Sequence, residues 1–292
     1  MTKTKLLKKT AFLVLATAAY GSTCYGVGSD QYANSVIDFS SQWSTTTWSA
    51  QQAVGAPNVT SYGDNSNAWL ASVRDGTLEF IGLGYAAPVY AYGATIRETS
   101  GSGMVYKVEA RDIGGVWHIV WQGKDPNKEG AIANFFVKWP ITTYKVDGIK
   151  VHTNTDATTT WEEIDSVQLS GVTSNTIPAV SLVAADTVGS EVLASTGLFI
   201  VSRSLTANTA PLTVQYNITG TAINGTDFNS GAALTGLVTI PAGVNKVGLF
   251  IKPVDDVLKE NPESVTLTLV PNAKYQIMTK FTTGTVTINS DE

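Results

Sequence analysis

Short runs of alternating β-type residues, separated by turn residues, recur along almost the whole chain. Examples are VYAYGATIRET, MVYKVEARD, VWHIVWQG and KVDGIKVHT, which are rich in Val, Ile, Thr and Tyr and are separated by Gly, Asn and Asp. Such runs are typical of strands. Beyond the N-terminal segment only SAQQAVGA, from Ser49, indicates a short helix. We therefore expect an all-β protein made of sandwiches or jelly rolls rather than a parallel sheet.

The tryptophans divide the chain into two parts. All seven lie in the first 161 residues: Trp43, Trp48, Trp69, Trp117, Trp121, Trp139 and Trp161. Such a step in composition indicates two independently built cores, and the roughly 265 residues after the N-terminal segment suffice for two domains. Residues 171–178, GVTSNTIP, are small and polar and end in proline, so they are the expected linker. We predict one domain over 27–170 and a second over 179–292.

Residues 1–26 have the layout of a secretory signal peptide. Four lysines between positions 3 and 9 precede an apolar run that is too short to cross a bilayer, and small residues follow it. Cys24 is the only cysteine, so no intramolecular disulfide can form, and the residues before it do not form a lipobox. No later apolar stretch is long enough to span a membrane. A secreted or cell-surface protein without an integral membrane segment is therefore expected.

The charge balance argues against nucleic-acid binding. The chain has 19 basic and 24 acidic residues, a net charge of −5, and removal of residues 1–26 takes away four lysines and no acid. The remaining part has a net charge of −9. Phosphate-backbone binding needs clustered Lys and Arg. We therefore expect no nucleic-acid partner.

Acidic residues gather between positions 220 and 269, with few basic residues nearby. They are Asp227, Asp255, Asp256, Glu260 and Glu263. Carboxylates clustered in loops between strands repel one another unless a cation holds them together, and Ca²⁺ takes six to eight oxygen ligands at roughly 2.3–2.6 Å. The spacing DD-x3-E-x2-E can place several carboxylates around one or two ions. The alternative is that these acids are solvated loop charges on a sandwich that binds no metal.

The same region resembles a Calx-β domain, a β-sandwich found in sodium–calcium exchangers, integrin β4 and many bacterial surface proteins. The resemblance rests on GTAxxGTDF, VTIPAG, PxDDxxxExxESVTLTL and GTVTINSDE, in that order. It covers about the last 110 residues and implies an immunoglobulin-like sandwich that binds Ca²⁺. The final Asp run of the family reads NSD here, and this smaller number of anionic ligands predicts fewer ions or weaker binding. The implied metal ligands are Glu191, Asp227, Asp255, Asp256, Glu260, Glu263 and Asp291.

Residues 30–170 resemble a discoidin-like, galactose-binding-type jelly roll, in the version found beside the protease unit of pappalysins and on bacterial exported proteins. The blocks that carry the resemblance are YANSVIDFSSQW, WSAQQAVGAPN, AWLASVRDGTLEFIGLGY, ATIRETSGSG, VEARDIGGVWHIVWQG and WEEIDSVQL. We expect a hairpin around Gly114 and Gly115, because a tight turn favours glycine. In the last block, Ile164, Val167 and Leu169 are the expected core residues.

Jelly rolls of this type often bind sugars or lipid headgroups in loops at one end. Trp43, Trp48, Tyr62 and Trp69 lie in the loop-rich early region and could form an aromatic platform. The alternative, favoured for any single Trp, is burial in the core. Four acids of this domain could form a structural Ca²⁺ site where its first and last strands meet, although surface charge is the favoured interpretation. They are Asp38, Glu162, Glu163 and Asp165.

No enzyme is expected. His118 and His152 are the only histidines, and neither has a second His at a metal-ligand spacing. The sequence has no G-x-S-x-G elbow, phosphate-binding loop or dinucleotide fingerprint. Glu162 and Glu163 lie near Trp161, but adjacent strand residues point to opposite faces and would not act on one substrate.

The expected function is calcium-dependent adhesion or recognition outside the cell, with a glycan or extracellular-matrix ligand. Ca²⁺ would order the acidic loops of the second domain and fix its angle to the first, a population shift selected by the metal. The alternative is a carbohydrate-binding protein that acts through the first domain, with the second domain as a spacer. A third possibility is an accessory to an exported hydrolase.

Overall fold

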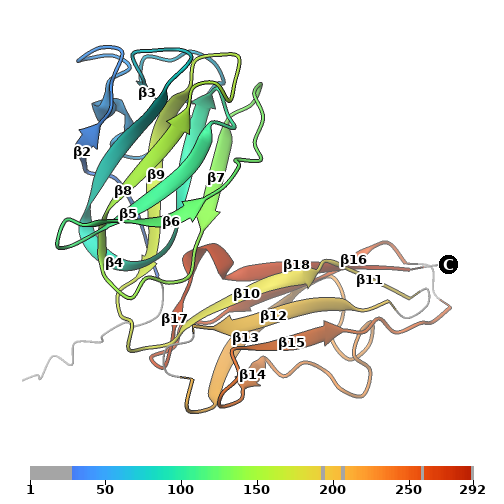
Figure 1. Cartoon of the computed structure of the whole chain (residues 1–292). Coiled ribbons are helices and arrows are strands. Elements are labelled where there is room, and N and C mark those ends of the chain that lie inside the picture. Colours follow the sequence, from blue (N-terminus) through green and yellow to red (C-terminus); the bar gives the residue numbers. More distant parts are fainter. Residues whose placement is uncertain (1–27, 192–194, 205–207, 258–259, 291–292) are drawn as a thin grey trace, which may run out of the picture.

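The structure is a computed structural model that describes residues 28–191, 195–204, 208–257 and 260–290. Almost all of its regular elements are strands, arranged in two sandwiches that meet at an angle (Figure 1). The expected fold class is confirmed: an N-terminal jelly-roll sandwich precedes an immunoglobulin-like one. The signal-peptide segment, Cys24 and Asp291 lie outside the described residues. Within the described ranges, no helix has the length and apolarity needed to cross a membrane.

The first sandwich contains nine strands. They are β1 (Ser29–Tyr32), β2 (Ser35–Phe39), β3 (Trp69–Leu70), β4 (Leu78–Ser100), β5 (Val105–Asp112), β6 (Trp117–Gln122), β7 (Ala133–Lys138), β8 (Val146–Asn154) and β9 (Glu163–Val172).

Strand β4 belongs to both layers of this sandwich. Its first half pairs with β2 and β8, and β8 continues to β5 and β6. Its second half, from Tyr90, pairs with β9 and β7, while β1 and β3 also pair with β9. Alternate side chains of both layers point inward. Ile164, Val167 and Leu169 are fully buried among them, which confirms the expected core positions.

The hairpin and the short helix that the sequence predicts in the first sandwich are both present. Strands β5 and β6 form the expected hairpin, and Gly115 at its tip has a φ of +88°, which a residue with a side chain rarely adopts. The segment expected to be a short helix is the 3₁₀ helix η1 (Ala50–Ala53).

The second sandwich has a four-stranded and a five-stranded sheet, in the orders β15-β12-β10-β17 and β11-β18-β16-β13-β14. Its strands are β10 (Ala179–Asp186), β11 (Val188–Ser190), β12 (Gly197–Arg203), β13 (Leu212–Gly220), β14 (Leu237–Ile240), β15 (Lys246–Ile251), β16 (Glu263–Leu269), β17 (Gln276–Ile277) and β18 (Thr283–Asn289). The chain changes sheets between β10 and β11, and β11 pairs in parallel with β18.

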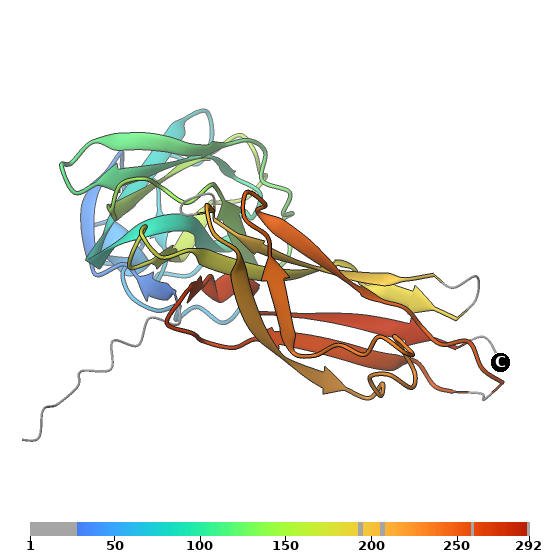
Figure 2. The same cartoon turned by 90° about the horizontal axis from the view of Figure 1, so that it is seen from below.

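The two sandwiches are joined by a small apolar cluster at the base of the first one. Tyr92, Val172 and Ala179 form its buried centre. Phe281, which ends the 3₁₀ helix η3 (Thr279–Phe281) of the second sandwich, packs against this cluster, and the ammonium group of Lys138 lies 4.4 Å from the centroid of its ring. We call this contact the joint. Figure 2 shows η3 lying against the first sandwich while the second sandwich extends away from it.

Polar contacts hold the segment that connects the sandwiches. The Gln276 side chain accepts hydrogen bonds from the backbone N–H groups of Thr173 and Ser174 at 3.1 and 3.2 Å. The Gly28 N–H group donates to the Ile277 carbonyl at 2.6 Å. The connecting segment is therefore fixed to the second sandwich by hydrogen bonds.

Candidate functional site

The loops at the end of the first sandwich farthest from the joint form a groove lined by aromatic side chains. In Figure 1 these loops lie at the top, around β3. One cavity of about 140 Å³ is bounded by Trp43, Trp48 and Trp161, and a neighbouring one of about 300 Å³ by Tyr62 and Arg74. Asp64 and Trp161 line both cavities, so the two are continuous. We call this surface the tryptophan groove and define it by Trp43, Trp48, Tyr62, Asp64, Arg74 and Trp161.

The two outer tryptophans of the groove support each other. The rings of Trp43 and Trp161 pack edge to face, with centroids 5.2 Å apart and an interplanar angle of 72°. Trp43 is 51% exposed, although an isolated loop tryptophan would normally bury more of its apolar surface. Its backbone N–H group donates to the Leu70 carbonyl at 2.9 Å, which fixes the loop to β3. The exposed ring is thus held in place by the fold.

Trp48 is held in a backbone conformation that is unusual for a residue with a side chain. Its φ is +49°, a left-handed value that costs about 1–3 kcal/mol in a non-glycine residue. Both its backbone groups are bonded, the N–H to Ser66 and the carbonyl to Leu70. Its indole Nε1–H donates to Asp64 Oδ1 at 2.8 Å. This geometry turns the ring into the groove.

A buried acid lies behind Asp64. Glu163, the first residue of β9, is fully buried and accepts the Asn65 N–H group at 3.1 Å. Burial, together with the neighbouring Asp64 carboxylate, raises the pKa of Glu163 to about 8. At neutral pH the Glu163 carboxyl group therefore favours its protonated form.

The far side of the groove supplies a cation and a phenol. The Arg74 guanidinium donates to the Thr159 carbonyl, which places it next to Trp161. The Tyr62 hydroxyl accepts the Gly101 N–H group at 3.3 Å. The groove thus combines apolar ring faces with a carboxylate, a guanidinium and a hydroxyl, the mixture that recognises a polar ligand with apolar faces.

The four residues considered for an aromatic platform divide between the groove and the core. Trp43, Trp48 and Tyr62 lie in the groove, but Trp69 is 1% exposed and belongs to the core. Trp161 and Arg74 were missed because nothing in the sequence shows that their loops meet those of Trp43 and Tyr62.

The expectation that four acids of this domain are surface charges is wrong for three of them. Glu162, Glu163 and Asp165 are 3% exposed or less. Asp165 is paired with Arg97 at 3.2 Å, whereas Asp38 lies on β2 and pairs with Lys150 at 2.7 Å. Burial raises the pKa of Glu162 to about 7. The four acids bond to different partners and do not form one site.

In the second sandwich, four of the expected metal ligands converge at the end of the sheet that carries β16 and β18. The pKa of Glu263 is raised, first by burial and next by the neighbouring Asp227 carboxylate. The carboxylates of Glu260 and Glu191 add smaller contributions in the same direction. Asp227 follows β13, and its Oδ2 accepts the Ile223 N–H group at 2.6 Å. One carboxylate oxygen of Glu263, Oε2, is buried with no hydrogen-bond partner among the described residues. We call Glu191, Asp227, Glu260 and Glu263 the acidic pocket.

The remaining expected ligands are Asp255, Asp256 and Asp291. Asp255 and Asp256 are exposed, just after Val254, whose N–H group donates to the Asp227 carbonyl at 2.9 Å. Asp291 lies outside the described residues. In the part of the chain that the structure describes, no three acidic, His or Cys side chains are grouped so that they could hold a metal ion. The donors suit Ca²⁺ chemically, but ion binding would require their loops to move closer together.

The acidic pocket is far from the joint. β18 begins just after η3 and ends at Asn289, whose carbonyl accepts the Glu191 N–H group at 3.1 Å. Its seven residues span roughly 20 Å at about 3.3 Å per residue. The contacts of the joint therefore lie at the opposite end of the second sandwich from the acidic pocket, and the expectation that Ca²⁺ fixes the angle between the sandwiches stays a prediction.

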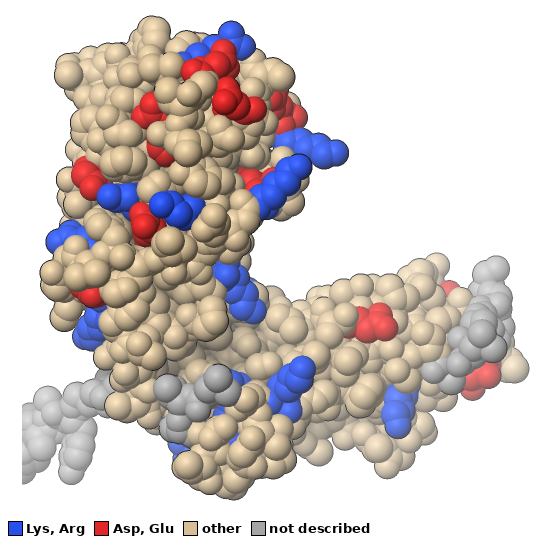
Figure 3. All heavy atoms as spheres, viewed as in Figure 1, with Lys and Arg blue, Asp and Glu red and all other residues tan. Residues whose placement is uncertain are grey.

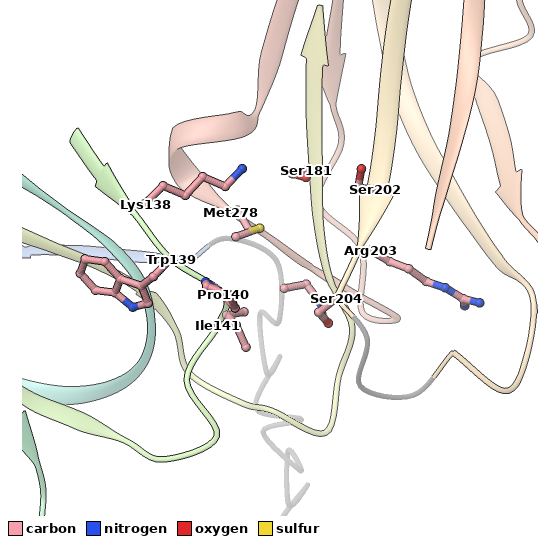
Figure 4. Close-up of a pocket in the computed structure, with 10 residues that line it drawn as sticks. Lys138, Trp139, Pro140, Ile141, Ser181, Ser202, Arg203, Ser204 and Met278 are labelled. Atoms are coloured by element: carbon pink, nitrogen blue, oxygen red, sulfur yellow. The ribbon is translucent and has the colours of Figure 1, made fainter. Parts of the chain in front are cut away.

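A third cavity, of about 430 Å³, lies beside the joint (Figure 4). Pro140, Ile141 and Met278 give it an apolar wall. The charged side chains at its edge are engaged elsewhere: Lys138 lies over Phe281, and the Arg203 guanidinium, which extends away from the cavity, donates to four backbone carbonyls. This cavity offers little polar recognition.

The surface charge is mixed on the face shown in Figure 3. Basic and acidic side chains alternate over the first sandwich, and most of the second sandwich is neutral on this face. His118 and His152 each pair with a carboxylate, Asp112 at 2.8 Å and Glu109 at 2.6 Å.

Comparison with known proteins identifies the first sandwich. Residues 26–179 match the family model described as pappalysin-1, SD scarf domain, C-terminal. No curated protein matches the chain significantly.

Several solved structures are similar in part. The apo form of the Calx CBD1 domain is 23% identical, with a TM-score of 0.32, and the match covers 40% of this chain and 99% of that one. The family 32 carbohydrate-binding module of Clostridium perfringens NanJ, solved with galactose, is 12% identical, with a TM-score of 0.37, covering 49% and 99%. Chitosan-binding module 1 of a chitosanase/glucanase from Paenibacillus sp. IK-5 is 10% identical, with a TM-score of 0.34, covering 50% and 96%.

Proposed function

This chain belongs to the pappalysin-1 SD scarf domain family through residues 26–179, and on that premise we propose that it is an extracellular recognition protein whose first sandwich binds a glycan in the tryptophan groove. The observation that carries the proposal is the pair Trp43 and Trp161, whose rings pack edge to face with centroids 5.2 Å apart and leave the Trp43 ring 51% exposed. Exposed aromatic rings of this kind suit the apolar faces of sugar rings.

The polar groups around the rings support a glycan over a purely apolar ligand. Asp64 and Arg74 lie at the floor and edge of the groove and can exchange hydrogen bonds with sugar hydroxyls. A pocket of mainly apolar walls with a few fixed polar groups is the usual form of a small-ligand site. The left-handed Trp48 backbone is the kind of local strain that collects at functional sites.

A glycan array with the full chain tests this proposal. We expect one class of glycan to bind, and Trp43→Ala to abolish that binding. Trp117→Ala is the matched control, because Trp117 lies on β6 under the Lys150 ammonium and away from the groove. Equal glycan binding by the wild type and Trp43→Ala would exclude the tryptophan groove as the glycan-binding site.

A second function is supported by the acidic pocket: binding of Ca²⁺ to the second sandwich. The supporting observation is the buried, unpartnered Oε2 of Glu263, next to Asp227. The ion would be held by Glu191, Asp227, Glu260 and Glu263. Asp255 and Asp256 would be further ligands once their segment closes, and Asp291 is the last of the ligands that the Calx-β resemblance implies. Ca²⁺ would cancel the repulsion among these carboxylates and order their loops. Calorimetric titration of the full chain with Ca²⁺, and with Mg²⁺ for comparison, tests this function.

A further inference from the structure

Two buried carboxylates meet beneath the loops of the first sandwich, beside the tryptophan groove. Glu98, near the end of β4, is 0% exposed, and Asp125, between β6 and β7, is 2% exposed. Other residues line the two cavities of the groove. The pair therefore has no part in the glycan contacts proposed above.

Each carboxylate has one bonded oxygen and one bare oxygen. The Gly103 N–H group donates to Glu98 Oε2 at 2.7 Å. The backbone and side-chain N–H groups of Asn127 donate to Asp125 Oδ1 at 2.9 and 2.8 Å. The remaining oxygens, Glu98 Oε1 and Asp125 Oδ2, are buried and have no hydrogen-bond partner among the described residues. A buried acceptor without a partner is destabilising.

The two side chains also repel each other. Three effects raise the pKa of Glu98 to about 9: burial first, then a contact in which the Glu98 and Asp125 carboxyl groups can share a proton, and then the repulsion between their charges. Within the described ranges, neither carboxylate forms an ion pair with Lys or Arg. The Gly103 N–H group opposes this rise only in part, because its hydrogen bond favours the ionised form of Glu98. Two carboxyl groups that meet in a buried position need either a shared proton or a positive charge between them.

We propose that Glu98 and Asp125 bind one divalent cation of the hard, oxygen-preferring class to which Ca²⁺ belongs. Two carboxylates neutralise its charge, and their bare oxygens are the hard donors that such a cation takes. This site is separate from the acidic pocket, which lies in the other sandwich.

The cation would also act on the groove. Asp125 begins the loop that carries Glu129, and the Glu129 carboxylate accepts hydrogen bonds from the backbone and the hydroxyl of Thr159. Thr159 precedes Trp161 by two residues, and its carbonyl is bonded to Arg74. Metal that fixes the Asp125 loop would therefore fix one wall of the tryptophan groove. Only this consequence rests on the proposed glycan function.

Terbium luminescence in the full chain tests the cation site without a glycan. All seven tryptophans lie in the first 161 residues, so light that excites Trp alone reports Tb³⁺ bound to the first sandwich and not to the second. We expect a signal that Ca²⁺ competes away and a melting temperature that rises with Ca²⁺. Glu98→Gln and Asp125→Asn should each remove this signal and lower the Ca²⁺ stoichiometry in calorimetry by one ion.

Asp147→Asn is the matched control, because Asp147 lies on β8, where its carboxylate pairs with Arg111. It should keep the signal. Glu263→Gln, which alters only the acidic pocket, should keep it as well. A wild-type protein without a Ca²⁺-competed signal, or unchanged competition in both Glu98→Gln and Asp125→Asn, would overturn the proposal and leave the pair sharing a proton. Neither result depends on whether a glycan binds.

Discussion

The Tyr92 hydroxyl lies 2.7 Å from the Thr279 hydroxyl, and this contact links β4 of the first sandwich to η3 of the second. The Thr279 hydroxyl also donates to Asp30 Oδ1 at 2.7 Å. The Lys280 ammonium is 3.5 Å from Asp30 Oδ2 and donates to Gln168 Oε1 at 2.7 Å. A buried aromatic ring and a short polar network thus hold the two sandwiches in one relative orientation.

Substitution at the joint should separate the unfolding of the two sandwiches. Tyr92 is fully buried, and Tyr92→Ala should cost about 3–5 kcal/mol, as removal of a large buried aromatic ring usually does. Because the lost contacts join the sandwiches, calorimetric scans should show two transitions in place of one. Phe250→Ala, an exposed ring on β15, should leave the scan unchanged. A single transition in Tyr92→Ala would contradict this view of the joint.

The Trp48–Asp64 hydrogen bond should matter for ligand affinity. Trp48→Phe keeps an aromatic ring but removes the Nε1–H donor, and a hydrogen bond to a charged group contributes about 1.5 kcal/mol or more. We expect roughly tenfold weaker glycan binding, because 1.4 kcal/mol corresponds to a factor of about ten. Tryptophan fluorescence titration would measure it. Unchanged affinity would show that the hydrogen bond does not orient the ring.

In metal-free buffer, stability should fall as pH rises from about 5 to about 9. The pKa of Glu98 is about 9 in the folded protein against its ordinary value of 4.5, so between these values the folded state binds more protons than the unfolded state. Rising pH then favours unfolding. Glu162 and Glu163, with pKa values of about 7 and 8, add to the same trend.

Glu98→Gln should reduce this pH dependence, most clearly above about pH 7, because only the contributions of Glu162 and Glu163 remain. Melting temperatures of both proteins in a chelator, measured across the pH range, provide the check. Saturating Ca²⁺ should flatten the wild-type curve as well. An identical pH slope in the wild type and Glu98→Gln would refute the assigned role of Glu98.

In the acidic pocket, Glu263→Gln should remove Ca²⁺ binding by the second sandwich. The substitution removes the carboxylate that the other acids surround, and it should raise metal-free stability slightly because it relieves repulsion. Asp255→Asn combined with Asp256→Asn should weaken Ca²⁺ binding without unfolding the sandwich. Calorimetric Ca²⁺ titration of these variants in a chain that also carries Asp125→Asn measures the acidic pocket alone, because Asp125→Asn removes the cation site proposed in the first sandwich. A double variant with full Ca²⁺ affinity would remove Asp255 and Asp256 from the ligand set.

The strands and the two-sandwich fold were predictable, because alternation and turn residues are local signals. Ile164, Val167 and Leu169 were placed correctly for this reason. The buried acids were not, since Glu162 and Glu163 look like surface charges until the partners that cover them are known. Trp161 joined the groove only through a contact with Trp43, 118 positions earlier in the sequence. Sites assembled from distant loops depend on topology, which residue patterns alone do not contain.

The central claim is that the tryptophan groove binds a glycan, and calorimetric titration of the best array glycan tests it most directly. Wild type, Trp161→Ala and Trp117→Ala would be compared in the same Ca²⁺-containing buffer. The account predicts saturable binding in the wild type and Trp117→Ala. Trp161→Ala should lose about tenfold in affinity or more, which corresponds to about 1.4 kcal/mol, because the substitution removes a ring face on which a sugar would pack. Equal affinity in all three proteins would contradict it.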